Sequence, residues 1–312
     1  MVPQRIDFLA IGEVLVDLIA SEPKKSLSEA RGFERCFGGA PANVAVNVAQ
    51  LGGRSALIAK MGDDPFGAFL RERLEAYGVI TQGVVIDPHR RTSLTFITQG
   101  IHPPQFDLRR DADLHLTPEE IEGDLIEGSR IVHTSAFALA EEPSRSAVLL
   151  ALAQAKGKGK RLSLDINYRE KVWLNGDEAR EVVGEALKSI DMVKASLEDV
   201  LALFGKEERE DYLERLHRLG PGLAVLTLGG EGCLVSEGGR VTHIPTFPVE
   251  AVDWTGAGDA FWAGFILALL DGRTPERAAR LGNRVAAIKG RGLGAIAPLP
   301  HRKEIYRRLE GN

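Results

Sequence analysis

Short apolar segments alternate with amphipathic segments over most of the chain. Six apolar segments are typical of strands: residues 6–12, 55–62, 130–137, 161–167, 190–196 and 223–230. Segments of helical character separate most of them. Because strands and helices alternate, the pattern predicts an α/β fold, with a mainly parallel sheet covered by helices on both faces.

Two of the helical segments can be delimited from their apolar positions. Val44, Val48 and Leu51 fall on one face of a helix, which Gly52 ends. Residues 65–78 show the same one-sided apolar pattern. These two segments are therefore predicted to be amphipathic helices.

Three segments depart from the alternation. Residues 232–245 predict an antiparallel hairpin. Residues 13–36 and 91–110 are both strand-like and lie close to candidate substrate motifs. We infer that these two form a small β-sheet lid over a larger core, and that residues 1–312 form one domain.

The composition limits the class of protein. Of the 312 residues, 44% are hydrophobic and 27% are charged, as in a typical globular protein. The net charge of −5 argues against nucleic acid as the main partner. The longest apolar run, residues 260–270, is shorter than the ~18–20 residues of a membrane span. We therefore expect no membrane partner. Cys36 and Cys233 form no CxxC pair, so we expect a cytoplasmic protein without a disulfide framework.

The segment DWTGAGDAF, residues 253–261, precedes an apolar stretch that is typical of a buried helix starting near Gly258 and Asp259. A helix start exposes unpaired N–H groups that attract anions, and small residues let a phosphate approach. A carboxylate beside such a site could act as a general base. The alternative, that Asp259 only caps the helix, explains the aspartate but not the small residues before it.

Two long segments resemble the signatures of a known family. DWTGAGDAF resembles the C-terminal signature of the ribokinase-like, PfkB-type carbohydrate kinases, and residues 38–67 resemble their N-terminal signature. The resemblance covers nearly the whole chain. It implies a three-layer α/β/α core with a small β-sheet lid.

The resemblance also implies roles for individual residues. Asp259 would be the catalytic base, and Gly256, Ala257 and Gly258 would form an anion hole for the transferred phosphoryl group. The positions that match sugar-binding residues of the family are Asp17, Gly38, Gly39 and Asn43.

Two further stretches resemble substrate motifs. Residues 106–116 resemble the family's R-x-A-D stretch, which would bring Arg110 near the substrate, with Arg109 as the neighbouring alternative. Residues 165–173 resemble a motif of fructokinases and 2-keto-3-deoxygluconate kinases, and Asn167 and Arg169 would lie at the sheet's carboxyl edge. From the residues alone, Arg169 is equally well explained as a surface arginine.

The nucleotide and metal residues follow from the same resemblance. The nucleotide-binding positions would be Lys194, Ser196, Thr227, Gly229, Gly232 and Asn283. Glu198 or Asp199 would contact Mg²⁺ through water, although the usual N-x-x-E motif reads Ser-Leu-Glu-Asp here. Asp253 and Thr255, with backbone carbonyls near residues 289–294, would match a monovalent-cation site, which makes K⁺ a further candidate.

The resemblance implies an ATP-dependent sugar kinase, with fructose as the first substrate candidate. A 2-keto-3-deoxygluconate kinase, a ribokinase and a nucleoside kinase are the alternatives, and a non-catalytic sugar or nucleotide sensor is the alternative of another class. We also expect a homodimer formed through the lid, because a small sheet cannot bury both of its faces alone.

Overall fold

Residues 5–100 and 105–310 are described by the computed structural model, and they form two sheets. The larger sheet has nine strands, in the order β13 (Arg240–Ile244), β12 (Cys233–Glu237), β11 (Leu223–Thr227), β10 (Met192–Ser196), β9 (Arg161–Asp165), β8 (Ser129–Ser135), β1 (Ile6–Ile11), β4 (Ser55–Gly62) and β5 (Ile80–Asp87). The strands from β11 to β5 are parallel, whereas β12 and β13 are antiparallel. The predicted parallel sheet and hairpin are confirmed.

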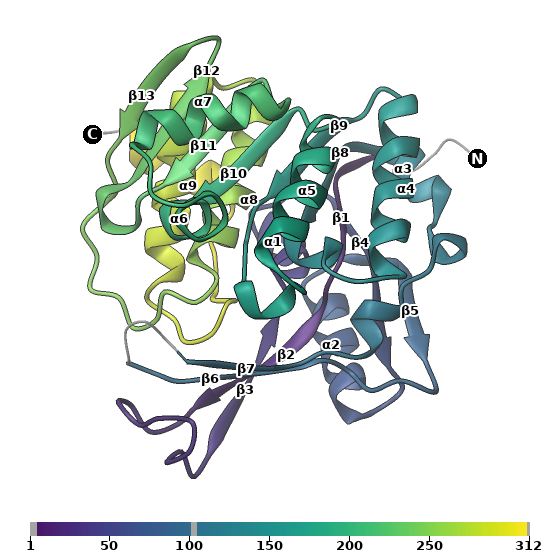
Figure 1. Ribbon diagram of the computed structural model, residues 1–312. Coiled ribbons are helices and arrows are strands. Elements are labelled where there is room, and N and C mark those ends of the chain that lie inside the picture. The colour runs from purple at the N-terminus through teal and green to yellow at the C-terminus, as the bar shows by residue number, and fades with distance from the viewer. Residues whose placement is uncertain (1–4, 101–104, 311–312) are drawn as a thin grey trace.

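Helices cover both faces of this sheet (Figure 1). One face carries α3 (Gly123–Gly128), α4 (Ser144–Gly157), α5 (Gly176–Leu187), α6 (Leu197–Phe204) and α7 (Arg209–Leu219). The other face carries α1 (Ala40–Gln50), α2 (Pro65–Ala76), α8 (Ala257–Leu270), α9 (Pro275–Lys289) and α10 (Arg302–Glu310). Short 3₁₀ segments lie at Ala112–His115, Pro118–Glu120, Ala136–Leu139, Glu170–Val172 and Gly229–Glu231.

Strand β4 shows why two helical layers form. All its residues are buried, and successive side chains point to opposite faces: Ile58 joins one hydrophobic cluster, and Leu57 joins the other. A strand that is apolar on both faces requires cover on both. The fold class predicted from the alternation is therefore confirmed.

The second sheet has four strands, in the order β3 (Phe33–Gly38), β2 (Leu15–Ala20), β6 (Leu94–Ile97) and β7 (Phe106–Arg109). Its central pair, β2 and β6, is parallel, and both outer pairs are antiparallel. These strands come from the two segments that break the alternation, and in Figure 1 the sheet projects from the lower part of the core.

Strand β5 was not predicted from the sequence. It pairs with β4 at the edge of the large sheet, and its residues are mostly half-buried. Because an edge strand lacks the continuous apolar run of a central strand, its signal in the pattern is weak.

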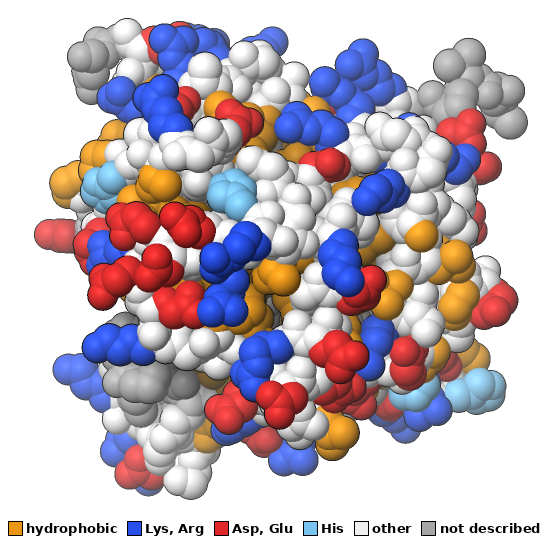
Figure 2. All heavy atoms as spheres, turned by 45° about the horizontal axis from the view of Figure 1, so that its top comes forward, with side chains coloured by type: hydrophobic (Ala, Val, Ile, Leu, Met, Phe, Trp, Pro, Cys, Tyr) orange, Lys and Arg blue, Asp and Glu red, His pale blue; other side chains and the backbone are white. Residues whose placement is uncertain are grey.

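Two observations concern the length of the apolar helices and the charge on one face of the molecule. Within residues 5–100 and 105–310, no helix is both long and apolar enough to cross a bilayer. On the face in Figure 2, Lys and Arg side chains are interspersed with Asp and Glu side chains. That face therefore lacks the continuous basic surface typical of nucleic-acid binding.

Candidate active site

Helix α8 begins at the carboxyl edge of the large sheet, and its position depends on close packing against α9. A β-carbon added at Gly264 would lie 2.9 Å from Val285, and one added at Gly282 would lie 2.7 Å from the Phe261 carbonyl. Glycine at both positions lets the two helices approach closely. Residues Ala260 to Ala268 of α8 are all buried. The start of α8 is therefore held rigidly within the core.

The first turn of α8 has the features of an anion site. Gly256 is the N-cap with φ 71°, and a β-carbon there would lie 2.7 Å from the Ala295 backbone. A residue with a side chain would thus be strained at this position. Helix α8 begins at Ala257, slightly earlier than predicted.

Three of the four N–H groups at this turn are available to a ligand. The Ala257 N–H donates to the Trp254 carbonyl at 3.0 Å. Within residues 5–100 and 105–310, no acceptor takes the N–H groups of Gly256, Gly258 or Asp259. The N–H groups without an acceptor are therefore those of Gly256, Gly258 and Asp259. The sequence analysis expected Ala257 in the anion hole and did not include the Asp259 N–H.

The Asp259 carboxylate is buried, with 9% of the residue exposed, and accepts a hydrogen bond of 2.8 Å from the Asn43 side-chain amide. Asn43 lies on α1, which packs against α8. Burial raises the pKa of Asp259 to about 7, although the Lys194 ammonium and the Asn43 hydrogen bond both oppose this shift. A carboxylate with a pKa near neutrality is suited to accept a proton.

Lys194 supplies positive charge beside the same turn. Its Nζ donates to Asp165 Oδ2 at 2.7 Å, and both side chains are almost fully buried. Burial alone would lower the pKa of Lys194, but the carboxylates of Asp165, Asp259 and Asp199 outweigh burial and raise it. A β-carbon added at Gly258 would lie 3.2 Å from this Nζ. The ammonium group therefore directly adjoins the anion site.

Asp17 lies on β2 of the four-stranded sheet and is 6% exposed. Burial raises the pKa of Asp17 to about 8, and the nearby carboxylates of Asp259 and Asp253 add to the shift. No donor within residues 5–100 and 105–310 makes a hydrogen bond to Asp17, and a β-carbon at Gly38 would lie 2.6 Å from Asp17 Oδ2. A buried carboxylate in this state is suited to accept a ligand hydroxyl.

Gly39 links this sheet to α1. It is the N-cap of α1 with φ 99°, and a β-carbon there would lie 2.5 Å from the Glu13 carbonyl. The tight turn at Gly39 brings the end of β3 next to the start of α1. Asn43 therefore reaches Asp259 from a position adjacent to the four-stranded sheet.

Arg110 points inward, whereas the side chain of Arg109 is 69% exposed. The Arg110 Nε and Nη2 groups both donate to Asp113 Oδ2, at 2.9 and 2.6 Å, and Nη1 donates to the Phe137 carbonyl at 3.2 Å. Ser93 Oγ donates to Asp113 Oδ1. The charge of Arg110 is thus balanced within the chain.

Glu13 is a buried polar residue that the sequence analysis did not assign to the site. It accepts hydrogen bonds from the Ala40 N–H at 3.2 Å and from Ser135 Oγ at 2.9 Å. Burial raises the pKa of Glu13 to about 8, with its hydrogen bonds and Arg110 opposing the shift. The only sequence signal was a carboxylate that follows a buried strand.

Asp199 and Ser196 form a capping box at the start of α6. Ser196 Oγ donates to Asp199 Oδ2 at 2.6 Å, and the Asp199 N–H donates to Ser196 Oγ at 3.0 Å. Asp199 Oδ1 accepts from Arg169 Nη1 at 3.1 Å. Both oxygens of Asp199 therefore accept hydrogen bonds within the chain, whereas Glu198 is exposed.

Asn167 has φ 29°, and its N–H donates to Asp165 Oδ1 at 3.3 Å.

The other predicted nucleotide residues lie around strands β11, β12 and β13 of the large sheet. Thr227 ends β11, and its Oγ1 donates to the Ala195 carbonyl at 3.3 Å. Gly229 and Gly232 lie at the turn between β11 and β12, and both have positive φ. The side-chain amide of Asn283 donates to the Ile244 and Pro245 carbonyls, both at 3.1 Å. Asn283 thus anchors the segment after β13.

Asp253 fastens the segment that leads into α8. Its Oδ1 accepts from the Thr255 N–H at 2.9 Å and from Thr255 Oγ1 at 2.8 Å, and its Oδ2 accepts from the Gly294 N–H at 2.8 Å. Lys289 is fully buried, and its Nζ donates to the Asp253 carbonyl at 2.9 Å. Burial lowers the pKa of Lys289 to about 8, although Asp253 and Asp259 oppose the shift.

Potential magnesium ligands are sparse. No cluster of three or more His, Cys, Asp or Glu side chains that could enclose a metal occurs in the described part of the chain. Mg²⁺ keeps several waters and is usually held by one or two carboxylates together with substrate phosphates. Glu198 is exposed and carries no hydrogen bond from a described residue, whereas Asp199 is buried and already accepts from Arg169 and Ser196, so Glu198 is the first candidate for such a role.

Comparison with known proteins identifies the family. Residues 6–302 match the family described as "pfkB family carbohydrate kinase". The chain belongs to this family. It is therefore a carbohydrate kinase, a phosphotransferase that acts on a sugar, and the sensor alternative is set aside.

Individual relatives are similar over nearly their whole length. The chain is 35% identical to the "ATP-dependent 6-phosphofructokinase" of Thermoanaerobacterium thermosaccharolyticum, covering 95% of this chain and 92% of that protein. It is also 35% identical to the "Fructokinase" of Klebsiella pneumoniae, with coverages of 96% and 98%. A double-mutant fructokinase of Vibrio cholerae O395, solved in a form bound to fructose, ADP and potassium ion, has a TM-score of 0.85 and 32% identity, with coverages of 97% and 98%.

The structure brings part of the predicted site into direct contact. Asn43 contacts Asp259, and Lys194 adjoins Gly258, although these residues are far apart in sequence. Asp165 and Lys289 were not predicted as site residues. A sequence signal existed for Asp165, which ends a buried strand at the carboxyl edge of the sheet.

Proposed function

We propose that this carbohydrate kinase transfers the γ-phosphoryl group of ATP to fructose and forms fructose 6-phosphate. The observation that carries the proposal is the buried Asp259 carboxylate, which lies in the first turn of α8 and is held by Asn43 at 2.8 Å. In this arrangement a proton acceptor and an anion site share one helical turn.

The proposed reaction is an in-line displacement. Asp259 accepts the proton of the sugar hydroxyl as the hydroxyl oxygen forms a bond to the γ-phosphorus. The bond from this phosphorus to the β,γ-bridging oxygen breaks, and ADP leaves. With its pKa raised to about 7, Asp259 is partly ionised at neutral pH and can accept this proton.

Charge on the transferred group would be stabilised from two directions. The N–H groups of Gly256 and Gly258 are free to donate to phosphoryl oxygens, and the Lys194 ammonium lies beside them. These donors are fixed before the reaction starts, because α8 and β10 are buried elements. They therefore need little reorganisation in the transition state.

Mg²⁺ would enter with ATP, with Glu198 as the carboxylate at its water shell. Bound there, the ion would neutralise phosphate charge and keep the phosphates in place. Thr227, Gly229 and Gly232 would contact the nucleotide at the end of the sheet, and Asn283 would support the segment beside it.

The balanced charge of Arg110 supports a neutral sugar. Arg110 is paired with Asp113 through two of its nitrogens, and its side chain is 6% exposed. An anionic substrate would require a cation with a nitrogen still free to donate, whereas all three nitrogens of Arg110 are used within the chain. Asp17 and Asn43, with the backbone of Gly38 and Gly39, would bind the hydroxyl groups of fructose.

Fructose 6-phosphate is the second candidate acceptor, because a relative at 35% identity is named as a 6-phosphofructokinase. It would need a cation for its phosphate. Arg169 is the first candidate for this role: its Nη1 is used by Asp199 and the Tyr168 carbonyl, but its side chain is 48% exposed and its other nitrogens have no partner among the described residues. The same argument applies to 2-keto-3-deoxygluconate and its carboxylate.

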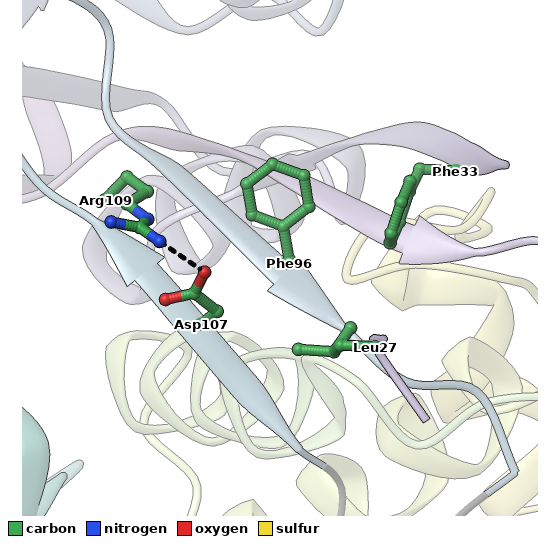
Figure 3. Close-up of a pocket in the computed structure, with 5 residues that line it drawn as sticks. All are labelled: Leu27, Phe33, Phe96, Asp107 and Arg109. Atoms are coloured by element: carbon green, nitrogen blue, oxygen red, sulfur yellow. Dashed lines mark hydrogen bonds and ion pairs between the residues drawn. The ribbon is translucent and has the colours of Figure 1, made fainter. Parts of the chain in front are cut away.

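The four-stranded sheet would cover the sugar and also form a homodimer contact. Leu27, Phe33 and Phe96 line an open cavity of about 380 Å³ on this sheet, beside the ion pair of Asp107 and Arg109 (Figure 3). The Phe33 and Phe96 rings meet edge to face, with centroids 5.2 Å apart. An apolar surface with a polar rim is suited to a second copy of the chain.

The test is a substrate panel combined with Asp259→Asn. The panel compares phosphorylation of fructose, fructose 6-phosphate, 2-keto-3-deoxygluconate, ribose and adenosine, each with ATP and Mg²⁺. We expect the highest kcat/KM with fructose. We expect Asp259→Asn to lower kcat by about three orders of magnitude and to leave ATP binding nearly unchanged, because the amide cannot accept the proton.

The outcomes separate the parts of the proposal. Preference for an anionic substrate would reject fructose and would make Arg169→Met the next variant. Near-normal turnover by Asp259→Asn would reject its role as base. Asn43→Asp is a useful companion variant, because it replaces the amide donor to Asp259 and leaves the Asp259 carboxylate in place.

A further inference from the structure

Lys289 is a fully buried lysine whose role the proposed reaction does not explain. It is the last residue of α9 and lies close to the start of α8, because the two helices pack tightly. Its Nζ donates to the Asp253 carbonyl at 2.9 Å. A buried ammonium group is costly, so a role for its charge is expected at this position.

The carbonyl that Lys289 contacts belongs to the segment before the anion site. Asp253 immediately precedes Trp254, whose carbonyl accepts the Ala257 N–H, and Gly256 follows. Gly290 holds the same segment through its carbonyl, which accepts from the Asp253 N–H at 3.2 Å. Lys289 therefore acts on the backbone that determines the position of the anion site.

The residues at this position do not fit a bound potassium ion, although the similar fructokinase from Vibrio cholerae was solved with one. The expected ligands were Asp253, Thr255 and nearby carbonyls. Both carboxylate oxygens of Asp253 are already used by Thr255 and Gly294. The Asp253 carbonyl is used by an ammonium group, which would repel a second cation at contact distance.

We infer that the Lys289 ammonium group takes the place of a monovalent cation, so that this kinase requires no potassium. The inference concerns the same active site and rests on the kinase reaction proposed above. A tethered lysine is present whatever the salt composition and loses no translational entropy on binding. With its pKa lowered to about 8, the amine is mostly protonated at pH 7. Lys289 is a positioning residue here, since its contact is with the Asp253 backbone and not with the reacting groups.

The experiment compares the full-length protein with Lys289→Met in potassium, sodium and tetramethylammonium chloride at equal ionic strength. Lys303→Met is the matched control, because Lys303 is exposed on α10. Turnover is measured with the best substrate of the panel. The unfolding temperature is measured in the same salts without ATP or sugar, so that one readout is independent of substrate identity.

We expect turnover by the wild-type protein and by Lys303→Met to differ less than about twofold among the three salts. We expect the turnover of Lys289→Met to fall about tenfold or more in tetramethylammonium chloride and to recover in part in potassium chloride. The unfolding temperature of Lys289→Met should rise with potassium relative to tetramethylammonium, whereas that of the wild-type protein should not.

Two results would overturn the inference. One is a wild-type protein whose turnover or unfolding temperature depends strongly on potassium. The other is a folded Lys289→Met variant whose losses are equal in all salts, which would indicate a packing role only. If Lys289→Met does not fold, the wild-type salt comparison still decides. If no sugar is phosphorylated, the fructokinase proposal fails, while the unfolding comparison still tests Lys289.

Discussion

Buried charged groups have partners within the chain at the carboxyl edge of the large sheet, whereas one on the four-stranded sheet does not. At the carboxyl edge, Lys194 is paired with Asp165, and Asp199 is bonded to both Arg169 and Ser196. On the four-stranded sheet, Asp17 is buried without a hydrogen bond from any described residue. The other face of the same sheet carries the half-buried rings of Phe33 and Phe96, which line an open cavity.

This difference suggests a division of labour. The core edge is organised before any ligand arrives, as expected for groups that stabilise a transition state. On the four-stranded sheet, one face has a buried carboxylate without a hydrogen-bond donor, and the other face has an open apolar cavity. A sugar would satisfy Asp17 on one face, and a second copy of the chain would cover the aromatic residues on the other.

Among the variants that test this comparison, Lys194→Met should have the largest effect, because it would remove the charge that organises the core edge. Loss of the ammonium beside Gly258 should lower kcat by about 10²–10³-fold, because charge on the transferred phosphoryl group would lose a fixed partner. It should also leave Asp165 buried and unpaired. Steady-state kinetics and the free energy of unfolding would measure the two effects.

Asp165→Asn with Lys194→Met serves as the control for that second effect. The double variant should recover part of the stability that Lys194→Met loses, because it removes the unpaired charge, but it should recover no turnover. Equal kcat for wild type and Lys194→Met would contradict the assigned role.

A smaller effect, dependent on pH, is expected for Asp17→Asn. Burial raises the pKa of Asp17 from 3.8 to about 8, so the folded protein binds a proton that the unfolded chain releases. The resulting stability is fully present below about pH 4 and is lost as the pH rises to about 8. In the ligand-free protein, the free energy of unfolding should fall with rising pH by at least about 1 kcal/mol less in Asp17→Asn than in the wild type.

Unfolding by denaturant at pH 5 and pH 8 would test this expectation. Asp17→Asn should also raise KM for the sugar much more than KM for ATP, since the carboxylate is proposed to accept a sugar hydroxyl. An identical dependence of stability on pH in the two proteins would show that Asp17 does not carry the shift. A proportional rise in both KM values would point away from a specific sugar contact.

The smallest effect on catalysis is expected from Phe96→Glu, which tests the other face of the four-stranded sheet. A charge in the apolar cavity should convert a dimer to a monomer, with kcat changed by less than about fivefold. Sedimentation equilibrium would measure the mass. Leu174→Glu is the matched control, because Leu174 is 87% exposed on the core. A monomeric wild-type protein would rule out the dimer.

Much of the fold could be predicted from short-range patterns. The alternation of apolar and amphipathic segments predicted the parallel sheet, and the apolar stretch after Asp259 predicted the buried helix α8. These predictions succeeded because burial on one or both faces leaves a direct periodicity in the sequence. Strand β5 was not predicted, because a strand at the edge of the sheet is only partly buried and need not carry a continuous apolar run.

The site was only partly predictable. The motif around Asp259 indicated a helix start beside an anion, but nothing local indicated that Asn43 would donate to it. The use of the Ala257 N–H by Trp254 was equally invisible, because it depends on the conformation of one turn. The pairing of Lys194 with Asp165 required neighbouring parallel strands in the observed register.

Local sequence therefore accounts for the elements, the helix start at Asp259 and the family signatures, because each depends on residues a few positions apart. The tertiary structure accounts for the partners of the charged groups: Asn43 with Asp259, Asp165 with Lys194, and the Asp253 carbonyl with Lys289. The reason is physical. A buried charge is tolerated only where packing brings a partner to it, and that partner can lie anywhere in the chain.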